Sequence, residues 1–232
     1  LVMTDIKAIT LTNKGYIDFT DNLISSIQKN NINIDLDICT MDKYTKEYFD
    51  KKKQNTNLVT ESNKKKFLRQ DSKNFGEYMV VKLNMIHSYL TKFEYVLYLD
   101  GDIVIKDQIT DYLSKMIGSL DLLIQNDQNP KKPNLEYLCA GFMLIKSNKK
   151  TLNFFDTSKI NSDELMQGLH DQGYINNNKH TLDYKKLPLE LFPNGPYFYE
   201  NSKNLKPKII HFNYVLGNKK KSIMKNYEEW YI

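Results

Sequence analysis

Two carboxylates at the end of an apolar run are the residues of this chain best suited to chemistry. The run Tyr95–Leu99 leads into Asp100, Gly101 and Asp102, after which the chain turns apolar again. Two carboxylates held so close repel one another unless a cation lies between them. Oxygen ligands suit Mg²⁺ or Mn²⁺, ions that keep coordination positions for substrate phosphates. The pattern predicts a divalent metal site at Asp100 and Asp102 that holds a nucleotide diphosphate.

The element before this pair separates a metal site from an ordinary turn, in which aspartate and glycine are both common. Tyr95–Leu99 is a continuous apolar and aromatic run, typical of a strand buried on both faces. In open α/β sheets, ligands bind at the carboxyl ends of the strands. We therefore favour the metal site, and a plain turn is the alternative.

A histidine near the end of the chain is the second candidate metal ligand. His211 ends the apolar fragment Lys208–His211, and the lysine run at 219–221 follows it closely. Neutral imidazole binds Mn²⁺ well and can complete a site begun by two aspartates. Ammonium groups beside a metal–diphosphate centre would neutralise a departing phosphate. The alternatives are a structural histidine and a cationic helix without a catalytic role.

The periodicity of the apolar residues predicts the elements that position these groups. Strand Asp5–Leu11, helix Tyr16–Asn30 and strand Ile34–Thr40 form a parallel strand–helix–strand unit, for which a right-handed crossover is expected. Helix Glu77–Leu90 leads into the strand that carries the aspartates. Residues 44–75 are polar and lysine-rich, and we expect a short helix and a surface loop there.

The second half of the chain is expected to add strands and helices to the same domain. The predicted strands are Leu120–Gln125, Leu138–Lys146 and Leu182–Leu187, and the predicted helices are Ile109–Ile117, Thr151–Phe155 and Asp171–Asn177. Residues 126–134 contain two prolines and are predicted to form a loop. No internal repeat and no composition break marks a linker, so a single α/β domain is expected.

Composition excludes several classes of protein. Hydrophobic residues make up 41% of the 232 residues and aromatic residues 12%, enough for a substantial core. No apolar run approaches the roughly 20 residues that cross a bilayer. The net charge of +5 is concentrated in lysine runs, without the interleaved aromatics or motif of a nucleic-acid-binding protein, so no nucleic-acid partner is expected. Cys39 and Cys139 lie in apolar stretches, as small buried residues do.

Several segments together resemble a known family. In order along the chain they are Tyr95–Val104, Cys139–Lys146, Asp171–Asn177, Leu187–Gly195 and Ile209–Tyr214. The series resembles the nucleotide-diphospho-sugar transferase family, GT-A glycosyltransferases of the kind found in glycosyltransferase families 77 and 8. The resemblance covers nearly the whole chain. It implies one GT-A (Rossmann-like) domain over residues 1–232, with a mixed, mainly parallel central sheet flanked by helices. The nucleotide-binding half would span about 1–105 and the acceptor-binding half about 106–232.

The resemblance also implies roles for individual residues. Asp100 and Asp102 would form the Asp-x-Asp (DXD) metal site with His211, and Asp171 and Gln172 would be the catalytic pair near the donor sugar. The residues implied to contact the nucleotide-sugar are Thr10, Leu11, Thr12, Asn13, Asp42, Lys82, Asp100, Gly101, Gly141, Gly217, Lys219 and Lys221.

Some of these assignments have competing explanations. Gly217 follows His211 by six positions, further than in glycogenin-like relatives, so that either Lys219 or Lys221 could meet the diphosphate. Lys82 could be a solvent-facing helix residue, Asp171 an acid that interacts with a helix N-terminus, and Gly141 a packing glycine.

The implied activity is metal-dependent transfer of a hexose or pentose from a nucleotide-diphospho-sugar to a hydroxyl of a glycan or protein. Mn²⁺ (or Mg²⁺), a UDP-linked donor and retention of configuration are expected from the family. Two alternatives stay open: an inactive GT-A domain that binds a sugar nucleotide or glycan, and a basic nucleic-acid-binding protein. We expect a chain without a transmembrane segment, either cytoplasmic or a soluble catalytic domain excised from a longer protein.

Overall fold

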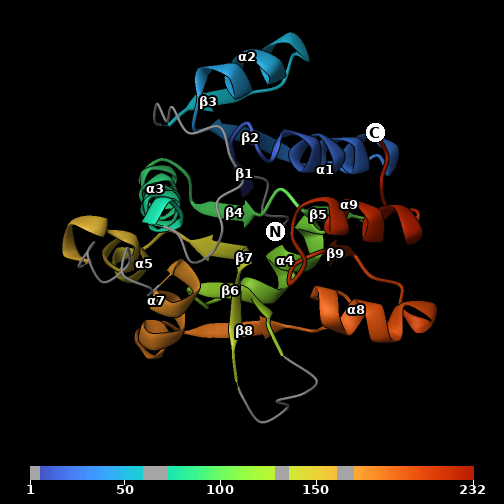
Figure 1. Cartoon of the computed structure of the whole chain (residues 1–232). Helices are drawn as coiled ribbons and strands as arrows, with labels where there is room; N and C mark the ends of the chain where they lie inside the picture. The colour runs from blue at the N-terminus through green and yellow to red at the C-terminus, as the bar shows by residue number, and fades with distance from the viewer. Residues whose placement is uncertain (1–5, 60–72, 129–135, 161–169) are drawn as a thin grey trace.

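Among the residues that the structure describes, seven strands from both halves of the chain form one sheet. The computed structural model describes residues 6–59, 73–128, 136–160 and 170–232. The strands lie in the order β3-β2-β1-β4-β7-β6-β8 (Figure 1). Their bounds are β1 Ile6–Thr12, β2 Asp35–Thr40, β3 Thr56–Leu58, β4 Tyr95–Leu99, β6 Leu122–Asn126, β7 Leu138–Lys146 and β8 Tyr184–Leu187.

The sheet is mixed and mainly parallel, as predicted. β1 runs parallel to β2 and β4, β2 parallel to β3, and β6 parallel to β8. β7 alone runs against its neighbours, β4 and β6. Because β7 is antiparallel, its N-terminal end lies beside the C-terminal end of β4, which brings Phe142 into register with Leu99.

Helices cover both faces of this sheet. Their bounds are α1 Ile17–Lys29, α2 Lys43–Lys51, α3 Lys73–Leu90, α4 Thr110–Ile117, α5 Lys149–Phe155, α7 Asp171–Asn178, α8 Gly195–Asn201 and α9 Gly217–Asn226. Helices α3, α5 and α7 share one apolar cluster with the sheet, and α1 and α4 share another on the opposite face (Figure 1).

Successive side chains of a strand point to opposite faces of the sheet and therefore pack into the two clusters in turn. In β4, Val96 and Tyr98 belong to the cluster under α3, whereas Leu97 and Leu99 belong to the cluster under α1 and α4. All four are fully buried. A strand buried on both faces needs apolar residues at every position, which is why Tyr95–Leu99 has no polar alternation.

A second, two-stranded sheet positions the C-terminal histidine. β5 (Ile103–Ile105) directly follows the Asp-Gly-Asp turn and pairs antiparallel with β9 (Ile209–His211). In this register His211 lies opposite Ile103, and the amide of Phe212 donates to the carbonyl of Asp102. Segments more than a hundred residues apart in the chain are thereby joined beside the turn.

Most predicted elements are confirmed, with differences in the polar segments. The predicted strand Leu182–Leu187 begins at Tyr184, and the predicted helix Glu77–Leu90 begins at Lys73. The short strand β3 and helix α8 were not predicted. β3 has three residues and no buried side chain, so it carries no apolar pattern to read. Parts of the two predicted loops, residues 60–72 and 129–134, lie outside the described residues.

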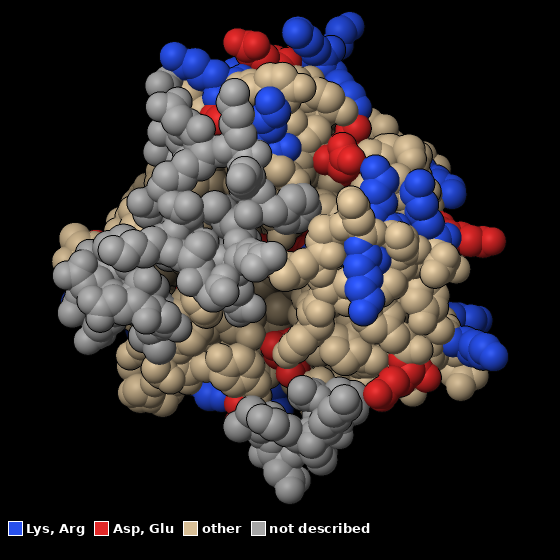
Figure 2. Space-filling view, viewed as in Figure 1, with Lys and Arg blue, Asp and Glu red and all other residues tan. Residues whose placement is uncertain are grey.

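The lysines are distributed unevenly over the surface. Lysine side chains gather over α2 and over α9 (Figure 2). The run at residues 51–53 is exposed, as a solvated face would be, whereas the run in α9 contains one buried lysine, discussed below. Among the described residues, no helix has the length and apolar character needed to span a membrane.

Candidate active site

A cleft opens where β1 and β4 end and β7 begins, beside the first residues of α7. Eight of the residues named from the sequence line it: Asn13, Lys82, Asp100, Gly101, Asp102, Gly141, Asp171 and Gln172. Five more lining residues were not anticipated: Tyr16, Tyr78, Met79, Ala140 and His170. The cleft therefore lies at the carboxyl edge of the sheet, where the sequence places it.

The Asp-Gly-Asp turn is fixed by backbone hydrogen bonds and by the close approach of helix α1. The amide of Asp100 donates to the carbonyl of Gly141 at 2.7 Å, and the amide of Ile103 donates back to the carbonyl of Asp100 at 3.2 Å. A Cβ at Gly101 would lie 2.7 Å from Oγ1 of Thr20 in α1. Only glycine lets α1 approach the turn this closely.

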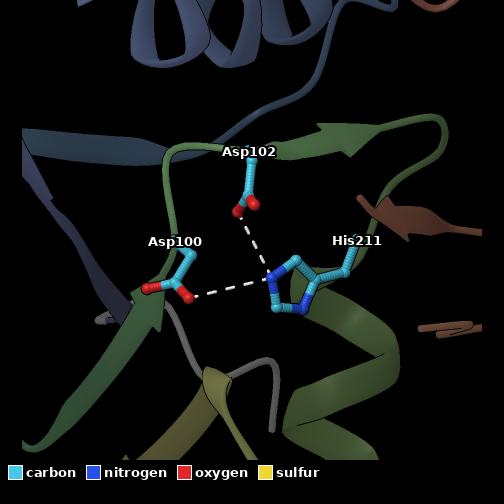
Figure 3. A group of neighbouring side chains, drawn as sticks. All are labelled: Asp100, Asp102 and His211. Carbon is cyan, nitrogen blue, oxygen red and sulfur yellow. Dashed lines mark ion pairs between the residues drawn. The ribbon is translucent and has the colours of Figure 1, made fainter. Parts of the chain in front are cut away.

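The two aspartates and His211 converge in space (Figure 3). Nε2 of His211 lies 3.2 Å from Oδ1 of Asp102 and 3.7 Å from Oδ2 of Asp100. One ligand atom from each residue lies within 4.8 Å of the others. Adjacent ligands of an octahedral ion with bonds of about 2.1 Å are about 3 Å apart, so the group fits a divalent cation with only small adjustments.

The space around these ligands depends on a glycine in β7. A Cβ at Gly141 would lie 2.3 Å from Cε1 of His211 and 2.6 Å from Oδ2 of Asp100. Both distances are far below ordinary van der Waals contact. Gly141 thus leaves the room that these two ligand side chains occupy.

Gln125 fixes which nitrogen of His211 faces the aspartates. The Gln125 amide nitrogen donates to the carbonyls of Phe192 and Pro193, at 3.1 and 3.0 Å, so its oxygen must face the histidine. Nδ1 of His211 lies 2.7 Å from that oxygen and must carry a proton to donate to it. In the neutral ring, Nε2 is therefore the bare nitrogen, directed at Asp100 and Asp102, as metal-binding histidines require.

Two basic groups, His211 and Lys220, lie against Asp102. Burial would lower the pKa of the His211 imidazole, but neighbouring Cys139 and Asp102 raise it well above its usual value. Burial would raise the pKa of Asp102, but Lys220 and His211 hold it well below its usual range. Lys220 of α9 is 3% exposed and forms an ion pair with Asp102. Positive charge is thus already concentrated at the carboxylate.

A second buried ion pair forms another part of the wall. Nζ of Lys82 in α3 lies 2.8 Å from Oδ2 of Asp171 and 3.5 Å from Oδ1 of Asp100, and it donates to the carbonyl of Ala140. It also lies 4.1 Å from the centre of the Tyr98 ring. Lys82 is 2% exposed and Asp171 is 5% exposed. Lys82 is therefore an interior residue, not a solvent-facing one.

Gln172 is held at both ends of its amide. Its oxygen accepts from the backbone amide of Ala140 at 3.3 Å, and its nitrogen donates to Oδ2 of Asp127 at 3.0 Å. Asp127 follows β6 and is 2% exposed. The contacts fix the orientation of the amide, because a nitrogen must face the carboxylate.

Of the residues that were predicted to contact the nucleotide-sugar, those in the first 42 positions divide into one that lines the cleft and four that do not. Thr10 and Leu11 are buried within β1, and Thr12 accepts from Thr20 at 2.9 Å. Asn13 lines the cleft. Asp42 lies at the N-cap of α2, where its carboxylate accepts from the amides of Thr45 and Lys14. Of this set, the structure brings Asn13 to the cleft.

The three lysines of the C-terminal run have different environments. Lys219 is exposed, and Lys221 pairs with Asp18 at 3.1 Å, on the outer side of α9. Neither makes the contact with Asp102 that Lys220 makes. Gly217 starts α9 with φ of +55°, a conformation that favours glycine.

Sequence reasoning missed Lys220, Gln125 and Asp127. For Lys220 a signal was present: Met224, four residues later and buried, is on the same face of the helix. Gln125 was the last residue of a predicted strand, and Asp127 was in a predicted loop. Only the three-dimensional fold brings these two side chains to His211 and Gln172.

The mixed, mainly parallel sheet flanked by helices has the GT-A glycosyltransferase fold. Residues 36–223 match the sequence profile described as "Nucleotide-diphospho-sugar transferase". The chain therefore belongs to the nucleotide-diphospho-sugar transferase family, a family of glycosyltransferases.

A curated galactosyltransferase is similar in sequence to part of this chain. The UDP-galactose:fucoside alpha-3-galactosyltransferase of Dictyostelium discoideum is 28% identical over 141 residues, 49% of this chain. The matched region spans 20% of the length of that relative.

Solved structures share the fold at low sequence identity. Galactosyltransferase LgtC, in complex with donor and acceptor sugar analogues, has a TM-score of 0.59 at 13% identity, over 88% of this chain and 86% of its own. An active-site mutant of LgtC has a TM-score of 0.65 at 12% identity, over 95% of both chains. Glycosyltransferase GlyE of Streptococcus pneumoniae TIGR4 has a TM-score of 0.61 at 16% identity, over 98% of this chain and 60% of its own.

Proposed function

We propose that this chain is a metal-dependent glycosyltransferase that moves a sugar from a UDP-linked donor to a hydroxyl acceptor, with retention of configuration. The observation that carries the proposal is the convergence of Asp100 and Asp102, which line the cleft, with the buried imidazole of His211. Family membership supplies the reaction class. The UDP in the name of the Dictyostelium relative supports the choice of donor.

Glycosyl transfer requires stabilisation of separating charges, because an anionic diphosphate leaves an oxocarbenium-like sugar. Mn²⁺ or Mg²⁺ bound at Asp100, Asp102 and His211 would neutralise the leaving diphosphate. Lys220, now paired with Asp102, would add a second positive charge beside the leaving group. We assign this role to Lys220 in place of Lys219 and Lys221.

The arrangement of Asp171 and Gln172 favours attack from the same face as the leaving group. In this route the acceptor oxygen bonds to the anomeric carbon as the bond to the diphosphate breaks. The acceptor proton passes to the leaving phosphate oxygen. A covalent route needs a free nucleophile, but the Asp171 carboxylate is bound by Lys82, and the Gln172 amide is a poor nucleophile. Lys82 and Asp171 would then orient the donor sugar with Gln172.

The two halves of the chain would divide the substrates. Asn13 lines the cleft at the end of β1, and we assign it to the nucleotide, with residues 1–105 as the nucleotide-binding half. Residues 106–232 contribute Asp171, Gln172 and His211, and we assign this half to the acceptor side.

The test is a comparison of donor binding and turnover. The purified chain is titrated with UDP in the presence and absence of Mn²⁺, and UDP-sugars are screened for hydrolysis and for transfer to glycoside or hydroxyl-peptide acceptors. Asp102→Ala should abolish transfer and Mn²⁺-dependent UDP binding together. Asp111→Ala, which removes an exposed carboxylate on α4, should change neither.

The outcomes separate the reaction from the alternatives. Unchanged turnover in folded Asp102→Ala, checked by circular dichroism, would contradict the metal assignment. Mn²⁺-dependent UDP-sugar binding with neither hydrolysis nor transfer would indicate a binding module instead. An inverted anomeric centre, read from the ¹H NMR spectrum of the product, would contradict the proposed retention.

A further inference from the structure

An exposed aromatic ring stands on the segment between β9 and α9. Tyr214 is 57% exposed, although it is a large and partly apolar side chain. Its backbone φ is +64°, in the left-handed region that bulky residues rarely adopt. Such conformations persist only where surrounding contacts impose them, and they concentrate at functional sites.

The contact that holds Tyr214 is with a buried carboxylate beside the cleft. Its hydroxyl donates to Oδ2 of Asp127 at 2.8 Å. Gln172, which lines the cleft, donates to the same oxygen at 3.0 Å. Because both groups donate to the same oxygen, the distance between the Tyr214 hydroxyl and the Gln172 amide nitrogen cannot exceed the sum of these two hydrogen-bond lengths. The hydroxyl end of the Tyr214 ring thus lies beside the Gln172 amide, while more than half of the residue stays exposed to solvent.

The carboxylate is supported on its other side by two asparagines. Asn194 and Asn213 each direct a side-chain nitrogen at Oδ1 of Asp127, at 3.2 and 3.4 Å. Their own oxygens accept from the backbone amides of Tyr197 and Gly195. Among the ion pairs of the described residues, none involves Asp127. Hydrogen bonds to Asp127 thus fix Tyr214, Gln172, Asn194 and Asn213 in place. We call these four side chains the rim of the cleft.

The chemistry of this rim matches a sugar ring. Tyr214 is fixed at its backbone and at its hydroxyl, while more than half of its surface stays open. A pyranose has an apolar C–H face that packs on aromatic rings and an edge of hydroxyls that hydrogen-bond to amides. A serine or threonine of a protein acceptor has no such face.

We propose that Tyr214 is the platform on which the acceptor lies, and that this acceptor is a glycoside. The apolar face of the acceptor ring packs on Tyr214, and its attacking hydroxyl points toward the Gln172 end of the cleft. Asp127 is the positioning residue that sets Tyr214 and Gln172 relative to each other. The proposal rests on the proposed function, since it names the acceptor of the same site.

The first experiment measures acceptor binding without turnover. Protein loaded with Mg²⁺ and UDP is mixed with a panel of methyl glycosides, and binding is followed by saturation-transfer difference NMR. We expect saturation of ring C–H protons of at least one glycoside, and its loss in Tyr214→Ala. Leu216→Ala removes a neighbouring side chain of similar exposure (59%) that lacks a contact with Asp127 among the described interactions. It should leave binding intact.

The second experiment uses kinetics with the donor found active in the hydrolysis screen. Tyr214→Ala should raise the KM for the glycoside at least tenfold while the Kd for Mg²⁺-loaded UDP stays unchanged. Tyr214→Phe keeps the ring and loses the hydroxyl, so its KM should fall between those of the wild type and Tyr214→Ala. Transfer to a serine-containing peptide but to no glycoside would overturn the proposal.

Two further results would also overturn it. One is an equal effect of Tyr214→Ala and Leu216→Ala on glycoside binding. The other is a loss of UDP affinity in Tyr214→Ala, which would make the ring a structural support of the donor site. A wild-type chain that binds no UDP contradicts the proposed function itself, whereas UDP binding without a Tyr214 effect contradicts only this inference.

Discussion

Gly141→Ala tests whether the cluster of Asp100, Asp102 and His211 is a metal site. The added Cβ would lie 2.3 Å from Cε1 of His211, where carbon atoms need about 3.5 Å. It would also lie 2.6 Å from Oδ2 of Asp100. Two of the three ligands must therefore shift by about 1 Å, twice the roughly 0.5 Å that a functional site tolerates. We expect Mn²⁺ affinity to fall by about 10- to 100-fold, the range found when ligand positioning is disturbed.

Isothermal titration with Mn²⁺, with and without UDP, measures this loss. A drop of that size corresponds to about 1.4–2.8 kcal/mol of binding free energy. Gly118→Ala is the control, because Gly118 at the end of α4 has φ of +46° and nothing within 4 Å of an added Cβ. It should cost stability through backbone strain and leave Mn²⁺ affinity unchanged. Wild-type Mn²⁺ affinity in folded Gly141→Ala would refute the assignment.

The remaining predictions concern the groups around the ligands. Gln125→Leu removes the acceptor that holds the Nδ1 proton of His211, so Mn²⁺ affinity should fall by about 10- to 100-fold in titrations. The raised pKa of His211 means that a proton competes with the metal. Mn²⁺ affinity should therefore weaken by up to about tenfold per pH unit as the pH falls below that pKa, measured from pH 8 to pH 5. Lys82→Met leaves the carboxylate of Asp171 buried and unpaired, so urea unfolding should show a loss of about 3–5 kcal/mol.

Each of these predictions has an outcome that contradicts it. Equal Mn²⁺ affinity in Gln125→Leu and wild type would mean that the tautomer is set elsewhere. A flat pH profile in the wild type, matching that of His211→Ala, would remove His211 from the ligand set. Adding Asp171→Asn to Lys82→Met should recover stability, and no recovery would show that the lost energy came from packing of the lysine stem.

The core elements were predictable because their signals are local. Tyr95–Leu99 is apolar at every position, as a strand buried on both faces requires, and β4 has these bounds. The register of β9 against β5 was not readable, since it is set by pairing of short strands far apart in the chain. The convergence of His211 with the aspartates was predicted from the chemistry of imidazole as a metal ligand and from the family resemblance, and the structure agrees with it.

The choice among the C-terminal lysines shows where local reasoning fails. Lys219, Lys220 and Lys221 are identical in type, so the run itself shows no polar–apolar contrast, and the cue to the inward-facing lysine is Met224, four residues after Lys220. Successive side chains of an α-helix point about 100° apart. Which of the three lysines faces inward therefore depends on where α9 begins, at Gly217, and on how the helix packs. Asp127 was hidden for a different reason: its partners Gln172, Asn194 and Tyr214 come from three separate segments.

The proposed metal site consists of Asp100, Asp102 and His211, which would bind one divalent ion together with the donor diphosphate. The most direct measurement is a crystal structure with Mn²⁺ and UDP, in which anomalous scattering locates the metal. We expect one Mn²⁺ bound by both carboxylates and by Nε2 of His211, with Lys220 moved from Asp102 toward the phosphates. A Mn²⁺ bound elsewhere, or UDP bound at this cleft without the imidazole as a ligand, would contradict it.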